Sequence, residues 1–326
     1  MRDPAFFFQP AIYEHAAAVI DKTPWQVSRD EELLVSAHAA AYERYHHTPI
    51  TVGIDIYNLE AEAYGAVVDP TQGFGIPTIT KPLFKDAAQL LTLAPMQPET
   101  DGRLAMFVRA GQRLQQTFPE ADVRIPVSGP FSMASILLGF EAMLLASMIH
   151  PEVLQIGLLH LAELQSVFLQ AIHQAGLKPT LFESAATPPL ISPELFHQVE
   201  LPALKKLVAL VQQMQGTPPA LIMGGDTALL VQDLCSIGAG YLICPPETDQ
   251  ALFMQQMVAF PEIMIRINMQ SGVVSAGTRQ EIEEEVNRVL RLADGRKSVC
   301  IGTGVVPYET PMENIFYISE LLQQHA

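Results

Sequence analysis

The stretch ALIMGGDTALLVQDLCSIGAGYLIC (220–244) contains the pattern that decides the fold. It begins and ends with short apolar runs, 220–223 and 241–244, of the kind found in strands that are buried on both faces. Between these runs, residues 227–237 carry apolar side chains at helical spacing. This order predicts a strand, a helix and a second strand of an α/β fold.

The same alternation continues in both directions along the chain. We expect strands at seven apolar runs: 50–56, 123–128, 179–184, 220–223, 241–244, 263–268 and 298–302. We expect helices at 11–20, 29–46, 59–66, 101–118, 131–148, 151–175, 193–214, 227–237, 248–259, 278–293 and 311–324. An eighth strand is expected near 76–80, within a long stretch rich in Pro, Gly and Thr.

Eight strand–helix units without an early glycine-rich dinucleotide loop predict a (β/α)8 TIM barrel. We expect one domain over 1–326, with a helical N-terminal segment at 1–48 and the barrel at 49–326. The chain has 326 residues, 49% of them hydrophobic, which is enough to bury a large core.

Charge and cysteine content exclude several classes of protein. Nineteen basic and 35 acidic residues give a net charge of −16, which repels nucleic acids and anionic membrane surfaces. Three cysteines cannot form a disulfide framework and indicate a reducing compartment. No stretch approaches the roughly 20 apolar residues of a membrane span. We therefore expect a cytoplasmic protein with a small-molecule ligand.

Polar residues at the ends of the predicted strands are candidates for the site, because barrel sites lie at the carboxyl ends of the strands. These candidates are Asp55, Tyr57, Asn58, Ser128, Glu183, Ser184, Asp226, Asn268, Gln270 and Thr303. Each could instead cap the helix that follows, which is the commoner role of a polar residue there. Gly224 and Gly225 would let a ligand approach a helix N-terminus closely.

Asp55 stands out because it lies between Ile54 and Ile56, where desolvation of a carboxylate is costly. We expect it to be a working residue, so that Asp55→Asn weakens ligand binding about ten-fold and leaves stability nearly unchanged. Glu60 and Glu62 cannot share one helical face. We expect Glu62 to lie one turn from the site and Glu60 to be solvated.

Several segments together resemble the uroporphyrinogen decarboxylase superfamily, and most closely its branch of methylcobamide:coenzyme M methyltransferases. The segments are VGIDIYNLEAEAYGA (52–66), VSGPFSMASILLGFEAML (127–144), FESAATPPLISPELFHQVELPALKKL (182–207), IMGGDTALLVQDLCSIGAGYL (222–242) and GTGVVPYETPMENI (302–315). Their order and spacing match the family from residue 50 onward. The resemblance implies a (β/α)8 barrel with a deep pocket at its carboxyl mouth.

The resemblance to the methyltransferase branch implies a zinc enzyme. In that branch a His-x-Cys and a later Cys bind the zinc, and the zinc activates a substrate thiol. Here the matching positions are Ile222, Gly224 and Thr303, none of which is a soft ligand. We therefore expect no catalytic zinc and no methylation of coenzyme M.

The decarboxylase branch is matched only in part. Asp55 and Ser184 correspond to residues that contact its substrate, whereas its Tyr and His positions are Ile136 and Thr303. The N-terminal segment has no arginine pair to bind an octacarboxylate. The family's Gly-Asn-x-Asp motif is also changed, since Asn268 is kept and Gln270 replaces the Asp.

The resemblance leads to three hypotheses. The first is a methyltransferase that takes a methyl group from methylcobamide on a partner corrinoid protein and passes it to an acceptor not bound to zinc, such as a pterin. Asp55 and Glu183 would manage the acceptor's proton, with Tyr57 and Asn58 beside them. The second is a non-catalytic relative that binds a tetrapyrrole or a corrinoid protein. The third is a decarboxylase acting on a smaller substrate. The oligomeric state is left open.

Overall fold

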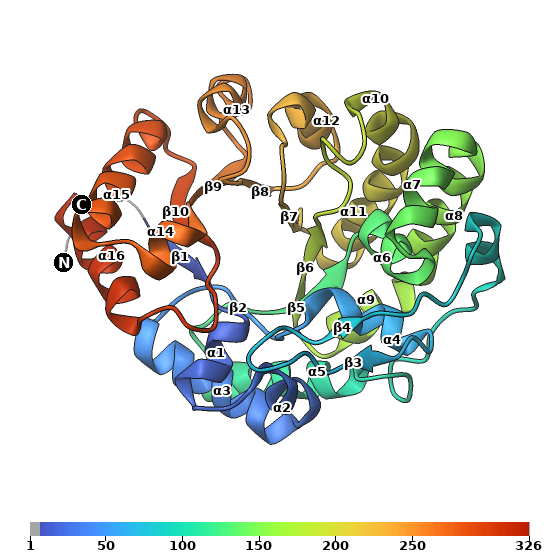
Figure 1. Ribbon diagram of the computed structural model, residues 1–326, viewed down its shortest axis with the longest axis horizontal. Coiled ribbons are helices and arrows are strands. Elements are labelled where there is room, and N and C mark those ends of the chain that lie inside the picture. The colour runs from blue at the N-terminus through green and yellow to red at the C-terminus, as the bar shows by residue number, and fades with distance from the viewer. Residues whose placement is uncertain (1–6, 326) are drawn as a thin grey trace.

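Eight parallel strands form one curled sheet around the centre of the molecule, with helices outside it (Figure 1). The computed structural model describes residues 7–325. The strand order is β1-β10-β9-β8-β7-β6-β5-β2, and every paired neighbour is parallel. The strands are β1 Phe8–Ala11, β2 Ile50–Thr51, β5 Val123–Ser128, β6 Lys178–Glu183, β7 Ala220–Met223, β8 Tyr241–Cys244, β9 Met264–Met269 and β10 Val299–Val305. The predicted TIM-barrel class is confirmed.

Helices alternate with the strands along the chain, as predicted. The α-helices are α1 Glu14–Val19, α2 Pro24–Arg29, α3 Glu31–Tyr45, α4 Leu59–Ala63, α5 Leu104–Thr117, α6 Pro130–Leu138, α7 Phe140–Ile149, α8 Pro151–Leu164, α9 Ser166–Gln174, α10 Pro193–Leu195, α11 Leu201–Gln215, α12 Val231–Ser236, α13 Gln250–Met257, α14 Ser271–Ala276, α15 Arg279–Ala293 and α16 Met312–Gln324. Three short 3₁₀ segments are η1 Ile56–Asn58, η2 Ala87–Thr92 and η4 Ala228–Leu230, and η3 Phe196–Glu200 is a π-helical turn.

The eighth strand lies at the N-terminus, so its predicted position near 76–80 was wrong. Residues 78–79 form β4, which pairs with β3 (Val68–Asp69) in a separate antiparallel sheet. The strand β1 belongs to the barrel sheet, which therefore begins before residue 49. Pro10 cannot donate a hydrogen bond, and the register shifts between Gln9 and Ala11. This irregular edge strand gives little periodic signal in the sequence.

The strand predicted at 50–56 is also shorter than expected. The backbone N of Val52 still donates to the carbonyl of Arg124 in β5, at 2.9 Å. The next residue, Gly53, has a φ of 143° and donates instead to Nε2 of His38, at 2.9 Å. The chain therefore leaves the sheet before it reaches Asp55.

The main core lies between the sheet and the surrounding helices. Its largest side chains include five fully buried phenylalanines: Phe107, Phe131, Phe168, Phe196 and Phe253. Contrary to the expectation from the sequence, one segment, Pro151–Gln174 with α8 and α9, is apolar and long enough to span a membrane, but half of its most apolar window is buried in the protein. Both of its helices contact α11, so the segment serves as core.

Candidate functional site

Two adjoining cavities open at the carboxyl ends of the barrel strands. The large cavity has a volume of about 470 Å³ and the small cavity about 300 Å³, which is the size range of small-molecule sites. Both are lined by Tyr13, Ile56, Tyr57, Ser184 and Val305, so they form one continuous hollow. The mouth of the barrel is therefore the candidate site, as predicted from the sequence.

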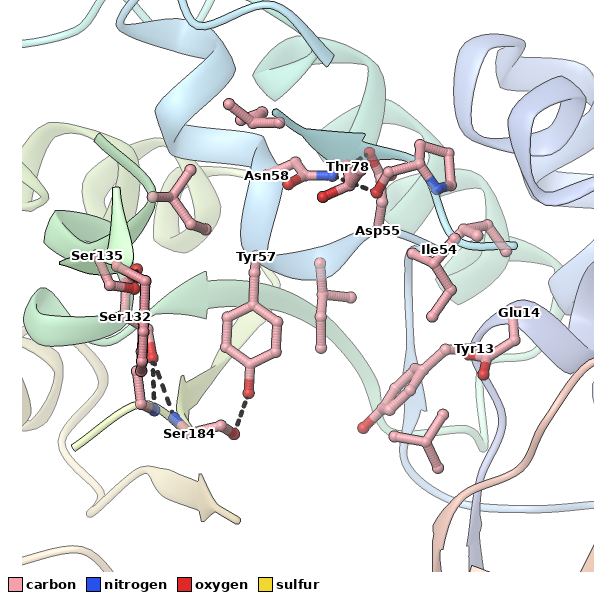
Figure 2. A pocket seen from close by; sticks show the side chains of 18 of the residues that line it. Tyr13, Glu14, Ile54, Asp55, Tyr57, Asn58, Thr78, Ser132, Ser135 and Ser184 are labelled. Carbon is pink, nitrogen blue, oxygen red and sulfur yellow. Dashed lines mark hydrogen bonds between the residues drawn. The ribbon is translucent and has the colours of Figure 1, made fainter. Parts of the chain in front are cut away.

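The large cavity has polar side chains on two facing walls. Figure 2 shows Tyr13 and Glu14 on one side, Ser132 and Ser184 on the other, and Tyr57 between them. Apolar side chains that are 40–43% exposed also line this cavity and form its rim. They are Ile76, Phe140, Leu190 and Val305. The site thus places a few polar groups in a largely apolar cavity with an apolar entrance.

Glu14 is the ionisable group best suited to proton transfer in the large cavity. It lies at the start of α1 and is only 7% exposed. Its Oε2 atom has no hydrogen-bond partner among residues 7–325. Burial raises the pKa of Glu14 to about 7, so this carboxyl can release and take up a proton near neutral pH. Glu14 is not among the residues predicted from the sequence, although an acid inside the apolar run AIYEHAAAVI was an available signal.

The opposite wall is held by a network of hydroxyl groups. The hydroxyls of Tyr57 and Ser184 are hydrogen-bonded to each other, and burial raises the pKa of Tyr57 far above its usual value. Ser132 Oγ donates to Glu183 and accepts from the backbone N of Ser184 at 3.0 Å and of Ala185 at 3.3 Å. Because its pKa is raised, Tyr57 is a neutral polar group at neutral pH.

Glu183 supports this wall from behind and does not line either cavity. Side chains alternate along β6, so Phe182 and Ser184 face the hollow while Glu183 faces the helices. Its carboxylate accepts from the backbone N of Ser132 at 3.0 Å. Burial and the charge of Glu183 raise the pKa of Glu200, which lies behind it, well above its usual value. The structure makes Glu183 a positioning residue.

Asp55 borders the large cavity, but its carboxylate is already paired. Arg103 donates from Nη1 to Oδ1 at 2.8 Å and from Nη2 to Oδ2 at 2.7 Å, and Asn58 Nδ2 also reaches Oδ2 at 3.2 Å. Arg103 Nε donates to Glu62 at 2.5 Å, and Glu62 also pairs with Arg29. The geometry places Asp55 and Glu62 in a buried ion-pair network, and the role of Asp55 toward a substrate stays a prediction.

Glu60 and Ser128 form a second buried cluster outside the cavities. Glu60 is fully buried and accepts from the backbone N and the Oγ of Ser128, each at 2.9 Å, and from Gln165 Nε2 at 3.1 Å. The expectation that Glu60 is solvated was therefore wrong. Ser128 serves this cluster and does not line either cavity.

The remaining predicted residues divide into two groups. Gly224, Gly225 and Asn268 line the small cavity. Asp226, Gln270 and Thr303 line neither cavity and bind other parts of the protein. Asp226 accepts from Thr248 Oγ1 at 2.7 Å, Gln270 Nε2 donates to the carbonyl of Pro246 at 3.1 Å, and Thr303 Oγ1 accepts from the backbone N of Ala11 at 3.0 Å.

Arg266 is a second residue that sequence analysis missed. It lies in β9 with Asn268 and lines the small cavity, where its Nε donates to Asn268 Oδ1 at 2.9 Å. The neighbouring Ile265 and Ile267 are fully buried on the other face of the strand. A basic residue within the apolar run IMIRIN was the available signal.

The residues at the family's zinc positions do not fit a zinc ion. Ile222 and Gly224 line the small cavity and have no side-chain donor atom, while the Thr303 hydroxyl is bound to Ala11. Within residues 7–325, no three His, Cys, Asp or Glu side chains are grouped so that they could hold a metal. No step through zinc follows from this site.

Comparison with solved structures shows the fold. A methyltransferase from Methanosarcina mazei has a TM-score of 0.80 at 18% identity, covering 97% of this chain and 92% of that one. SacUVDE has a TM-score of 0.43 at 13% identity, covering 97% and 98%. An endo-beta-N-acetylglucosaminidase from Cordyceps militaris has a TM-score of 0.35 at 10% identity, covering 68% and 76%. The last two similarities support no conclusion.

A search of curated protein sequences finds no match. The family described as Uroporphyrinogen decarboxylase (URO-D) matches residues 9–325, which is nearly the whole chain. The resemblance drawn from five segments is thus confirmed over the complete barrel, including β1. The chain belongs to the uroporphyrinogen decarboxylase family.

Proposed function

We propose that this protein is a methyltransferase that transfers a methyl group from methylcobamide, carried by a partner corrinoid protein, to a small-molecule acceptor not bound to zinc. Family membership and the likeness to a methanogen methyltransferase support the reaction class. The observation that carries the proposal is Glu14, a cavity carboxyl whose pKa burial raises to about 7.

Glu14 would act as the general base for the acceptor. A nucleophile that carries a proton must lose it as its bond to the methyl carbon forms. A carboxyl with a pKa near the working pH combines a useful ionised fraction with enough basicity to take that proton. The Tyr57–Ser184 pair, on the facing wall, would orient the acceptor by hydrogen bonding.

The rim is suited to the methyl donor. When bound, methylcobamide supplies the methyl group and keeps the electron pair of the bond that breaks. A corrin ring with its side chains is larger than the 470 Å³ cavity, so it would rest on the mouth. The exposed Ile76, Phe140 and Leu190 offer an apolar surface for one face of a macrocycle.

The proposal is tested by following the absorption spectrum of methylcobalamin with the protein and a panel of thiol and pterin acceptors, without oxygen. We expect demethylation that depends on an acceptor, and a rate about a hundred-fold lower in Glu14→Gln because the base is lost. Glu283→Gln on the exposed face of α15 is the matched control and should keep the wild-type rate.

Two results would contradict the proposal. Binding of methylcobalamin without turnover across all acceptors would favour the non-catalytic relative. Release of carbon dioxide from a porphyrinogen would favour the decarboxylase.

A further inference from the structure

Arg266 is a buried arginine in the barrel whose charge has no carboxylate partner. It is 5% exposed, and the groups that act on its charge are Tyr241, Tyr13 and Cys300. Burial raises the pKa of Tyr13 to about 12 and that of Cys300 to about 11, and raises that of Tyr241 further. All three groups are therefore neutral at physiological pH, and the guanidinium keeps its full positive charge.

Arg103 provides a comparison within the same molecule. It is 7% exposed, and its charge is met by Asp55 and Glu62. Among residues 7–325, no ion pair forms with Arg266, and its hydrogen bond is the one from Nε to Asn268. A buried charge without a partner is costly, so an arginine kept in this state indicates that a ligand supplies the anion.

The surroundings of Arg266 fix its orientation. Gly302 on the neighbouring strand leaves space for the arginine stem, because a Cβ there would lie 2.4 Å from Arg266 Cδ. Asn268 occupies Nε, which leaves Nη1 and Nη2 as the pair of parallel donors for a planar oxyanion. Glu247 is the one acidic residue among the described residues that line the small cavity, and its side chain is exposed to solvent.

We infer that the small cavity binds a carboxylate group of the substrate through Arg266. The uncharged part of that molecule would extend past Tyr57 and Ser184 into the large cavity, because both residues line both spaces. If the protein transfers methyl groups as proposed above, the methyl acceptor is then a carboxylic acid. That conclusion rests on the proposed function, whereas carboxylate binding at Arg266 does not.

The test uses 4-phenylbutyrate and its neutral counterpart 4-phenylbutyramide as probes, with affinities measured by calorimetry and no methyl donor present. The wild-type protein should bind the carboxylate about ten-fold more tightly than the amide. Arg266→Met keeps an aliphatic stem over Gly302 and should remove this preference, while the amide affinity stays within about two-fold. Arg291→Met, on the exposed face of α15, should behave as wild type.

Equal affinity of the wild-type protein for both probes, or no binding of the carboxylate, would overturn the inference. An equal loss for both probes in Arg266→Met would do the same. The wild-type comparison needs no variant, so the inference is testable even if Arg266→Met does not fold. Carboxylate binding without any methyl transfer would leave this inference standing and contradict only the proposed function.

Discussion

At the scale of single residues, the partners of each buried carboxyl decide what it can do. Asp55 has both oxygens bound to Arg103. Glu183 is held by backbone N–H groups and a serine. Glu14 keeps an oxygen without a partner, and burial raises its pKa. A carboxylate that is fully hydrogen-bonded stabilises the fold, whereas one that is only desolvated is available for proton transfer.

Asp55→Asn should reduce the free energy of unfolding by about 3 kcal/mol, because it removes one charge of a buried ion pair. Urea denaturation of the variant measures this loss. Asp294→Asn, at an exposed position after α15, is the control and should change little. A stable Asp55→Asn protein with weakened ligand binding would restore the role first expected for Asp55.

Glu14 should make stability depend on pH. Its folded pKa of about 7 lies above the ordinary value of 4.5, so the folded protein holds a proton that the unfolded chain releases. The stabilisation is complete below pH 4.5 and is lost as the pH rises through about 7, by roughly 3 kcal/mol. The difference between wild type and Glu14→Gln in urea titrations from pH 4 to 9 measures it.

The same group should set the pH dependence of methyl transfer. If Glu14 is the general base, kcat/KM rises with pH through about 7 in the wild-type protein. Glu14→Gln should give a flat and much lower profile. A wild-type profile without this inflection would contradict the role of Glu14 as base.

At the scale of secondary structure, regular elements were predictable and irregular ones were not. The apolar run of β9 and the helix that Ser192 caps were found from their patterns, and Ser192 Oγ accepts from the backbone N of Leu195 at 3.2 Å. The strand β1 was missed because Pro10 breaks its ladder and Thr303 satisfies the N–H that follows. The end of β2 depends on the contact of Gly53 with His38, which is distant from it in sequence.

The alternation of side chains along strands limits what could be inferred about the site. The mouth of the barrel followed from topology alone, and Tyr57, Asn58 and Ser184 do line it. Glu183 was also predicted to line the mouth. Because side chains alternate along a strand, Glu183 and Ser184 face opposite sides, and Ser184 is the one that faces the hollow. Arg103, which pairs with Asp55 from the other end of a long loop, could not be identified from local sequence.

The π-helical turn η3 places Glu200 near Glu183, and burial together with the charge of Glu183 raises the pKa of Glu200. Glu200→Gln places a neutral polar group with a donor beside Glu183 and should change the free energy of unfolding by less than about 1 kcal/mol. Glu200→Leu has a similar volume but no donor, and should cost about 2–3 kcal/mol. Equal stability of the two variants would show that a polar group beside Glu183 contributes nothing to stability.

At the scale of the whole molecule, charge and shape favour a particular kind of ligand. A net charge of −16 repels anions in general, and Arg266 offers a local positive charge inside the barrel. The apolar rim is continuous with the hollow through Phe140 and Leu190. This arrangement is compatible with a large methyl donor whose apolar face rests on the mouth and a small methyl acceptor inside the hollow.

The absence of catalytic zinc is a prediction for the whole protein. Purified protein that has not met a chelator should contain well under one zinc per chain, because Ile222, Gly224 and Thr303 cannot provide three ligands. Elemental analysis measures it. One zinc per chain, removed together with activity by a chelator, would overturn this prediction.

The central claim is methyl transfer without zinc, and its most direct test is demethylation of methylcobalamin by chelator-treated protein in the presence of thiol and pterin acceptors. The account predicts turnover that chelation does not reduce, that depends on an acceptor, and that falls about a hundred-fold in Glu14→Gln. Turnover that disappears on chelation and returns with zinc would contradict it, as would the absence of turnover with every acceptor.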